Sequence, residues 1–388
     1  MLKVSITTLG CKVNQYDSAA IRELMERRGF KFVSPEDSPQ VCIINTCTVT
    51  SSTSYQSRQE IRRCQRMNPQ ATIVVTGCYA QANPEEVSKI PGVNYVIGND
   101  HKTRIPDILI GDICKGAPPQ VWVGEIGSVT QVQEPGVESF GGRTRAFLKI
   151  QDGCDYFCSY CIIPFTRGRS RSLPLDEVKA RIKRLADVGF KEVVLTGVQL
   201  GGYGPDLARL VGEIEAMDLP IRVRLSSLEP NCVTPELIGH LMKGKKICQH
   251  LHLPLQSGDN YVLERMRRPY RREYFSRLVL ELVEKVPDIC IGTDIIVGFP
   301  GEGEESFRNT YNLVAELPIS YVHVFPYSVR EGTLAASLPE PVSPRLIKER
   351  SQALRELAVK KRRRFYERFL GREVLVLVEN TKDRRTGR

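Results

Sequence analysis

The sequence contains no run of about eighteen apolar residues, the length that a transmembrane helix needs. It also lacks a signal peptide's long apolar region, because residues 1–6 lead directly into a strand-like pattern. We therefore expect a cytoplasmic protein that does not associate with a membrane. Thiols stay reduced in that compartment, so the 12 cysteines predict metal or redox chemistry rather than a disulfide framework.

The composition is otherwise that of a folded protein. Apolar residues make up 41% of the chain and charged residues 26%, which is ordinary for a globular protein. A length of 388 residues is sufficient for two or three domains. The formal charge of +10 suggests a polyanionic partner.

Three cysteines, Cys154, Cys158 and Cys161, lie within eight residues and have no fourth cysteine nearby; we call them the loop cysteines. Structural zinc takes four protein ligands. A cubane iron–sulfur cluster held by three thiolates keeps one iron free to bind another ligand. The C-x3-C-x2-C spacing therefore favours such a cluster, and a partial zinc knuckle or unliganded loop thiols are the alternatives.

The first third of the chain alternates short apolar runs with amphipathic stretches, which predicts a parallel, doubly wound sheet. Strands are expected at residues 2–9, 41–45, 71–76 and 95–97, with helices at 17–28, 52–67 and 84–89.

Cysteines follow three of these strands: Cys11, Cys47 and Cys78, which we call the strand-end cysteines. All three would project from the carboxyl ends of parallel strands, the edge where such sheets bind ligands. Gly10 and Gly77 precede two of them and permit tight turns. The pattern predicts a second three-cysteine cluster site, and the alternative is that small cysteines simply fill strand ends.

The remaining cysteines have no such placement. Cys42 lies inside a strand and is predicted to belong to the core, and Cys64 and Cys114 are interpreted as incidental. Cys232, Cys248 and Cys290 are interpreted as structural because they lack cluster-like spacing.

Residues 116–142 contain prolines and glycines without sustained periodicity, which indicates a linker with one strand at 120–123. Strands are then predicted at 145–150, 192–196, 221–225, 250–253, 289–297 and 320–325, with helices at 175–188, 206–217, 235–242, 271–286 and 304–317. About six βα units suggest an open partial barrel rather than a closed one. His252 lies between Leu251 and Leu253 in one of these strands and is interpreted as either a core or a catalytic residue.

Three basic runs are interpreted as nucleic-acid contacts, with solvated helix faces as the alternative. They are Arg167, Arg169 and Arg171; Arg265, Arg267, Arg268, Arg271 and Arg272 around Tyr270; and residues 345–368.

The residues around the strand-end cysteines are TLGCKVNQYDS at 8–18, NTCTVT at 45–50 and TGCYAQ at 76–81. They resemble the N-terminal domain of the methylthiotransferase family of radical S-adenosylmethionine (SAM) enzymes, and the loop cysteines resemble that family's SAM-cleaving motif. These three motifs are most similar to those of the branch that acts on threonylcarbamoyladenosine in tRNA. The resemblance extends from residue 1 to about residue 370.

This resemblance implies transfer of a methylthio group to carbon 2 of threonylcarbamoyladenosine at position 37 of tRNA. The C–H bond at that carbon is not acidic and carries no leaving group, so general acid–base catalysis cannot activate it effectively. The resemblance implies two 4Fe-4S clusters and SAM as cofactors. The cluster on the loop cysteines would reduce SAM to a radical, and an auxiliary cluster on the strand-end cysteines would carry the sulfur.

The resemblance also implies a SAM site at the strand ends of the partial barrel. It further implies that Arg330 binds an anionic group of the substrate. Caps and turns are the plainer interpretation of the same residues. The SAM-binding candidates are Tyr160, Gln199, Gly202, Ser226, Glu229, Ile296 and Val297. Expected partners are tRNA that carries threonylcarbamoyladenosine and an electron donor such as flavodoxin or ferredoxin.

Four segments are expected: an N-terminal methylthiotransferase domain at 1–115, the linker at 116–142, a radical SAM domain at 143–370, and an incomplete start of a β-barrel of the TRAM type at 371–388. One strand is predicted at 373–378. The alternative functions are methylthiotransferases for isopentenyladenosine or for a ribosomal-protein aspartate, a non-catalytic iron–sulfur RNA-binding or electron-transfer protein, and a zinc-stabilised RNA-binding protein.

Overall fold

A computed structural model describes residues 2–111, 118–132, 135–204 and 206–379 of the chain. The chain divides into two compact units. Unit 1 comprises Met1–Gly142, Phe147–Asp155 and Cys161–Leu173, and unit 2 comprises Arg143–Ala146, Tyr156–Tyr160 and Pro174–Arg388.

Unit 1 is built on a six-stranded sheet with the order β2-β1-β3-β4-β5-β6. Every neighbouring pair in this sheet is parallel, which confirms the predicted architecture. The strands are β1 (Lys3–Thr8), β2 (Lys31–Phe32), β3 (Val41–Thr46), β4 (Thr72–Gly77), β5 (Val93–Ile97) and β6 (Gln120–Trp122). The strand expected at 120–123 is therefore the sixth strand of this sheet.

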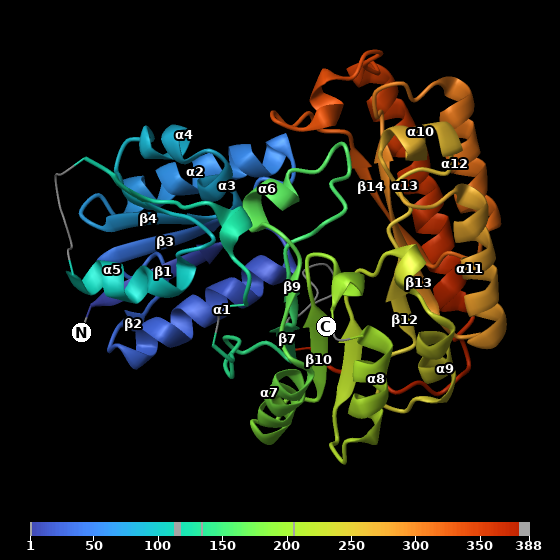
Figure 1. Ribbon diagram of the computed structural model, residues 1–388, viewed down its shortest axis with the longest axis horizontal. Helices are drawn as coiled ribbons and strands as arrows, with labels where there is room; N and C mark the ends of the chain where they lie inside the picture. Colours follow the sequence, from blue (N-terminus) through green and yellow to red (C-terminus); the bar gives the residue numbers. More distant parts are fainter. Residues whose placement is uncertain (1, 112–117, 133–134, 205, 380–388) are drawn as a thin grey trace. The chain divides into compact units, whose positions relative to one another are not determined.

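Helices cover both faces of the sheet in unit 1 (Figure 1). α1 (Lys12–Arg27) and α5 (Ile105–Gly111) pack on one face through residues such as Ile21, Met25 and Leu109. α2 (Ser51–Met67) and α4 (Pro84–Ser88) pack on the other face. β3 and β4 are buried along their whole length, as their β-branched runs predict for central parallel strands.

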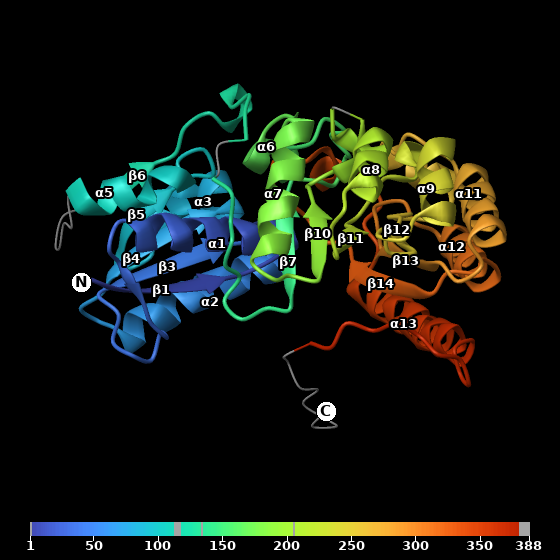
Figure 2. The same cartoon turned by 90° about the horizontal axis from the view of Figure 1, so that it is seen from below.

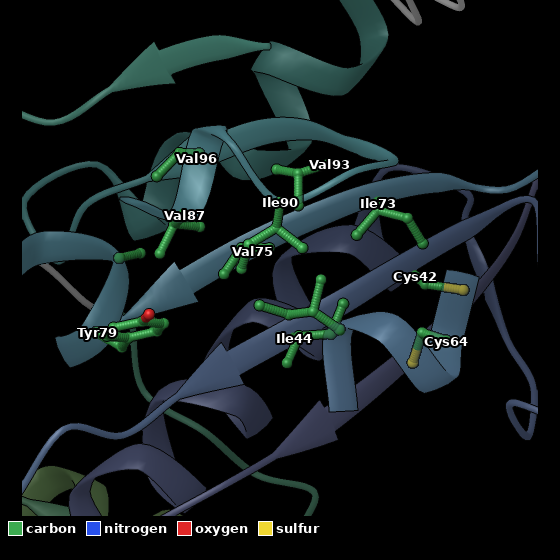
Figure 3. Packing of buried hydrophobic residues seen from close by; sticks show 12 residues of the cluster. Cys42, Ile44, Cys64, Ile73, Val75, Tyr79, Val87, Ile90, Val93 and Val96 are labelled. Atoms are coloured by element: carbon green, nitrogen blue, oxygen red, sulfur yellow. The ribbon is translucent and has the colours of Figure 1, made fainter. Parts of the chain in front are cut away.

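One core cluster of unit 1 contains two cysteines (Figure 3). Cys42 on β3 is buried, as predicted. Cys64 on α2 is buried in the same cluster, so the interpretation of Cys64 as incidental is wrong. Cys64 follows the buried Ile61 by three residues and the buried Ser57 by seven, so it lies on the sheet-facing side of this amphipathic helix. Cys114 lies outside the described residues.

Unit 2 contains the strands and helices of the partial barrel (Figure 2). One three-stranded sheet has the order β11-β10-β7 and a second has the order β12-β13-β14. Backbone bridging between Ser227 and His252 connects the two sheets. The strands are β7 (Arg145–Lys149), which begins in unit 2, β10 (Glu192–Thr196), β11 (Arg222–Leu225), β12 (His250–His252), β13 (Cys290–Val297) and β14 (Tyr321–Pro326).

Helices follow the strands of unit 2 as predicted. They are α7 (Leu175–Asp187), α8 (Leu207–Ala216), α9 (Pro235–Lys243), α11 (Arg272–Lys285), α12 (Glu304–Glu316) and α13 (Pro344–Glu367). Side-chain caps mark several starts: Asp206 accepts hydrogen bonds from two backbone amides of α8, and Ser343 accepts one from α13.

Several short elements have no counterpart in the predicted pattern. They are the strand β2, the helices α3 (Cys78–Ala82), α5, α6 (Ile163–Arg167) and α10 (Asn260–Arg265), the antiparallel pair β8 (Gln151–Asp152) and β9 (Arg171–Ser172), and 3-10 turns at Lys102–Arg104, Ile126–Ser128, Leu200–Gly202, Pro230–Cys232 and Leu334–Ser337. Elements of two to seven residues are too short to establish a period in the sequence.

The strand predicted at 373–378 is wrong: these residues are described and form no strand. Val374, Leu375, Val376 and Val378 alternate too little with polar residues to bury one face, and all four are exposed. A single strand without a neighbour has no ladder of hydrogen bonds to hold it.

None of the helices in the described part of the chain combines the length and the hydropathy that a bilayer crossing requires.

The sheet core of unit 1 can be tested at Ile44, which is fully buried on β3 in the cluster of Figure 3. We expect Ile44→Ala to lower the free energy of unfolding by about 2–5 kcal/mol, because it leaves a cavity in a packed core. Urea unfolding followed by circular dichroism measures the change. Val121→Ala, on the exposed side of β6, is the matched control and should change stability by less than about 0.5 kcal/mol. Equal losses in the two variants would contradict this packing.

Candidate functional site

The strand-end cysteines of unit 1 lie after three neighbouring strands. Cys11 follows β1, Cys47 follows β3 and Cys78 follows β4, and these strands are adjacent in the sheet. Because the strands are parallel, all three thiols belong to the same edge of the sheet. Cys11 is exposed and the other two are buried.

The two predicted glycine turns are present at this edge. Gly10 and Gly77 both have a φ of 96°. A Cβ on Gly10 would lie 2.7 Å from the sulfur of Cys47, and a Cβ on Gly77 would lie 2.4 Å from the carbonyl oxygen of Thr46. Glycine is therefore required at both positions by backbone conformation and by space.

Buried amide side chains hold the turns together. Asn14 Nδ2 donates to the carbonyl oxygens of Leu9 at 2.8 Å and Thr46 at 2.9 Å. Asn45 Nδ2 donates to the Asn14 carbonyl oxygen at 2.9 Å. These bonds connect the loop before Cys11 to the end of β3, so they fix the backbone that carries two of the thiols.

The electrostatics of this edge disfavour a free thiolate at Cys47. Burial, together with the charges of Cys78 and Cys11, raises the pKa of Cys47 to about 11. A buried thiol whose ionisation is disfavoured in this way requires a cation to hold it deprotonated, as metal or cluster binding does. The donor set and its surroundings thus fit an iron–sulfur cluster.

A buried ion network lies in the same unit. Arg167 donates to Asp17 at 2.9 Å and to Asp152 at 3.1 Å, and Lys149 donates to the same two carboxylates at 2.7 and 3.1 Å. Lys102 also pairs with Asp17. Burial opposes ionisation of Asp17, but these cations hold its pKa well below the usual range.

The loop cysteines are divided between the units: Cys154 and Cys161 belong to unit 1, and Cys158 belongs to unit 2. In unit 1, the Cys154 amide donates to the Gly168 carbonyl oxygen at 3.0 Å. Gly153 has a φ of 77°, and a Cβ there would lie 1.9 Å from the carbonyl oxygen of Arg169. The chain before Cys154 is therefore packed closely against the segment that follows α6.

In unit 2, Arg268 connects a loop cysteine to a predicted SAM residue. Its Nη1 lies 3.3 Å from the sulfur of Cys158, and its Nη2 pairs with Glu229. Burial raises the pKa of Glu229, and the charge of Arg268 opposes that rise. The sequence pattern assigned Arg268 to a basic surface, but the structure buries it at this position.

Two other SAM candidates share an apolar cluster of unit 2. Tyr160 and Ile296 both pack against a cluster that includes Met266 and Phe299. Such a surface suits the face of an adenine ring. Val297, by contrast, is fully buried, and its carbonyl oxygen accepts a hydrogen bond from the Tyr327 amide at 2.7 Å.

The remaining SAM candidates lie at the ends of β10 and β11. Ser226 is buried, and its Oγ has no hydrogen-bond partner among the residues that the structure describes. Gln199 Nε2 lies 3.6 Å from the sulfur of Cys232, and Gly202 ends the 3-10 turn that follows Gln199. Cys232 also lies 3.6 Å from the Tyr156 hydroxyl, so this cysteine, interpreted as structural, lies beside the predicted site.

His252 is not a lone histidine. Its Nε2 lies 2.9 Å from Asp294 Oδ1, and His323 Nδ1 lies 3.1 Å from the same oxygen. The three residues come from β12, β13 and β14, which are adjacent strands. Burial raises the pKa of Asp294, but the two histidines outweigh burial and lower it to about 2.

Tyr321 extends this group. Its hydroxyl lies 3.1 Å from His252 Nδ1 and 2.9 Å from His250 Nε2. A Cβ on Gly292 would lie 2.0 Å from the Tyr321 ring, so glycine makes room for the ring. Two imidazoles and a carboxylate are a ligand set for a divalent transition metal, but hydrogen bonding among these side chains already accounts for their arrangement. Only the order of the strands brings them together, so the sequence pattern gave no signal for the group.

The three basic runs differ in exposure. Arg167 and Arg268 are buried, so their assignment to phosphate contacts is wrong. Arg169 remains exposed and pairs with Asp155. The last part of the third run contacts the segment between α11 and β13, since Arg368 donates to the Pro287 carbonyl oxygen. Arg330 is partly exposed after β14.

Two family models match the chain. Residues 3–98 match the model described as "Uncharacterized protein family UPF0004", and residues 148–314 match the model of the radical SAM superfamily. Among solved structures, the radical S-adenosylmethionine methyltransferase TsrM from Kitasatospora setae matches with a TM-score of 0.64. It is 17% identical and covers 86% of this chain and 77% of its own, so it supports the α/β fold.

Relatives match over nearly the whole chain. The protein named threonylcarbamoyladenosine tRNA methylthiotransferase MtaB from Aquifex aeolicus is 43% identical over 97% of this chain and 93% of its own length. The protein of the same name from Bacillus subtilis is 43% identical over 91% and 80%. A tRNA-2-methylthio-N(6)-dimethylallyladenosine synthase from Pelotomaculum thermopropionicum is 34% identical over 100% and 89%. At this identity and coverage, the chain belongs to the radical SAM family of tRNA methylthiotransferases that includes the threonylcarbamoyladenosine enzymes.

Proposed function

We propose that this protein is a radical SAM enzyme that adds a methylthio group to carbon 2 of threonylcarbamoyladenosine at position 37 of tRNA. The observation that carries the proposal is the placement of Cys11, Cys47 and Cys78 after three adjacent parallel strands. A family relationship at 43% identity over 97% of the chain supports the substrate.

Two 4Fe-4S clusters and SAM are the cofactors of the proposed reaction. The strand-end cysteines would hold the auxiliary cluster and the loop cysteines the second cluster, each with three thiolates and one iron open to another ligand. When bound, these groups supply one-electron reduction of SAM and the sulfur that is transferred.

The residues of the chain bind and orient these groups. Arg268 holds Cys158 and Glu229 together, so that Glu229 is fixed beside a cluster ligand. Ser226 Oγ, buried and without a partner among the described residues, is suited to bind a SAM hydroxyl or carboxylate. Tyr160 and Ile296 supply an apolar surface, and Gln199, Gly202 and Val297 lie at the neighbouring strand ends.

The partners follow from the substrate. The tRNA would contact the exposed Arg169. The carboxylate of its threonylcarbamoyl group would bind Arg330. Flavodoxin or ferredoxin is the class of electron donor we propose. We also propose the division into an N-terminal domain at 1–115, a linker at 116–142 that contributes β6 to the sheet of unit 1, and a radical SAM domain at 143–370.

The activity can be tested by mass spectrometry of tRNA nucleosides. Anaerobically reconstituted enzyme, with SAM, a reductant and tRNA that carries threonylcarbamoyladenosine, should produce the 2-methylthio derivative. A parallel reaction with tRNA that carries isopentenyladenosine is the control and should give no methylthio product. Product only in the second reaction would assign the chain to the other branch, and product in neither reaction would contradict the function.

The cluster ligands can be tested by iron analysis. Reconstituted enzyme should contain about eight iron atoms per chain, because two cubanes of four are expected. Cys11→Ala and Cys154→Ala should each lose about half of the iron. Cys248→Ala, at a buried cysteine outside both sets, should keep the full iron content. An unchanged iron content in Cys11→Ala would exclude the strand-end site.

The SAM site can be tested at Ser226. We expect Ser226→Ala to raise the Kd of SAM about 2- to 10-fold, because one neutral hydrogen bond is lost. Isothermal titration of the cluster-loaded enzyme measures the change. Ser227→Ala, at the exposed neighbour, should leave the Kd unchanged. If both variants bind SAM as tightly as the unmodified protein does, Ser226 is not a SAM ligand.

A further inference from the structure

Arg167 is a buried cation that the proposed reaction leaves without a role. It ends α6, and it is only 2% exposed. We propose that Arg167 is a positioning residue for the auxiliary cluster: its fixed charge, held beside the strand-end cysteines, favours the reduced form of the cluster. The inference rests on the proposed function, because it requires a cluster on these three cysteines.

One side of the guanidinium reaches two of the thiols through Asn14. Arg167 Nη2 donates to Asn14 Oδ1 at 2.5 Å. The amide nitrogen of the same Asn14 side chain donates to the carbonyl oxygens of Leu9 and Thr46. Leu9 lies two residues before Cys11, and Thr46 directly precedes Cys47. A single side chain therefore separates Arg167 from the backbone that positions both thiols.

The third thiol is reached through Asn99. Its Nδ2 donates to the carbonyl oxygen of Thr166 at 2.6 Å and lies 3.8 Å from the sulfur of Cys78. Thr166 directly precedes Arg167, and α6 packs against α3, which begins at Cys78. The segment that ends at Arg167 is thus fastened to the turn that carries Cys78.

The charge of Arg167 also acts electrostatically on Cys78 and Cys11. Burial disfavours the charged guanidinium, but the charges of Cys78, Asp152, Asp17 and Cys11 together raise its pKa well above its ordinary value. Two of these four anions are strand-end cysteines. The electrostatic interactions and the hydrogen bonds through Asn14 and Asn99 therefore both place Arg167 near the strand-end cysteines.

The carboxylates of Asp17 and Asp152 are not sufficient to neutralise the charge of Arg167. Each of them contacts three cations, so each cation receives only part of a negative charge. The cations are Lys102, Lys149 and Arg167 around Asp17, and Lys149, Arg167 and Arg171 around Asp152. A buried charge requires compensation, and the thiolates of a bound cluster are the further anions within reach of Arg167.

A fixed positive charge has a defined effect on a cluster. Reduction by one electron makes the cluster more negative, so a nearby cation stabilises the reduced form and raises the reduction potential. Arginine suits this role because it stays charged under all conditions and contacts several acceptors at once. Removal of the charge should therefore lower the potential of the auxiliary cluster.

The test uses the full chain with Cys154, Cys158 and Cys161 replaced by alanine, so that only the auxiliary cluster contributes to the signal. This parent should hold about four iron atoms per chain. The midpoint potential is measured by a redox titration followed by electron paramagnetic resonance. A parent without iron would contradict the proposed function rather than the role of Arg167.

In this parent, Arg167→Gln should lower the midpoint by at least 59 mV, a tenfold change in a one-electron equilibrium. Arg167→Lys keeps the charge and should shift the midpoint less. Asp152→Asn removes a negative charge beside the guanidinium and should raise it. If Arg167→Gln loses its iron, retention of iron by Arg167→Lys supports the charge role, and equal loss in both variants overturns it.

Arg169→Gln is the matched control, because Arg169 belongs to the same loop but is exposed and pairs with Asp155. Its midpoint and iron content should equal those of the parent. The inference is overturned if Arg167→Gln keeps the parent's iron content and shows the same midpoint as Arg169→Gln. It is also overturned if Asp152→Asn lowers the midpoint or leaves it unchanged.

Discussion

The buried pairing of Asp17 with Lys149 and Arg167 is the interaction on which the organisation of unit 1 depends. Asp17 is separated from these cations by 132 and 150 residues in the chain. A buried charge that loses its partner costs about 3–5 kcal/mol, so segments that share such a network fold together. The segments 147–155 and 161–173 accordingly belong to unit 1, although unit 2 holds the residues between them. Two of the loop cysteines therefore fold with the sheet that carries the strand-end cysteines.

The sequence was sufficient for features that arise within one βα unit. Strand runs, helix periods and the glycine before a cysteine are local, so the positions of Cys11, Cys47 and Cys78 at strand ends could be predicted. The burial of Arg167 and Arg268 could not, because their partners Asp17 and Cys158 lie 150 and 110 residues away. From sequence alone, both arginines are indistinguishable from those of a basic surface.

The sequence could not predict groups of side chains that depend on the order of the strands in the sheet. His252, Asp294 and His323 meet only because β12, β13 and β14 are neighbours, and nothing in the sequence of one strand specifies its neighbour. The false strand at 373–378 is the converse case. Its residues have β propensity, but a strand requires a pairing partner, and propensity alone does not supply one.

Arginine lies beside the predicted ligands in both units, but its charge is distributed differently. Arg268 divides its charge between the sulfur of Cys158 and the carboxylate of Glu229, so it connects a cluster ligand to a predicted SAM contact. Arg167 shares its carboxylates with three other cations and interacts with two thiols of the strand-end set. The arrangement around Arg268 orients Glu229, and the arrangement around Arg167 leaves net positive charge near the strand-end cysteines. An excess of buried positive charge is stable only beside an anion, which a cluster held by three thiolates provides.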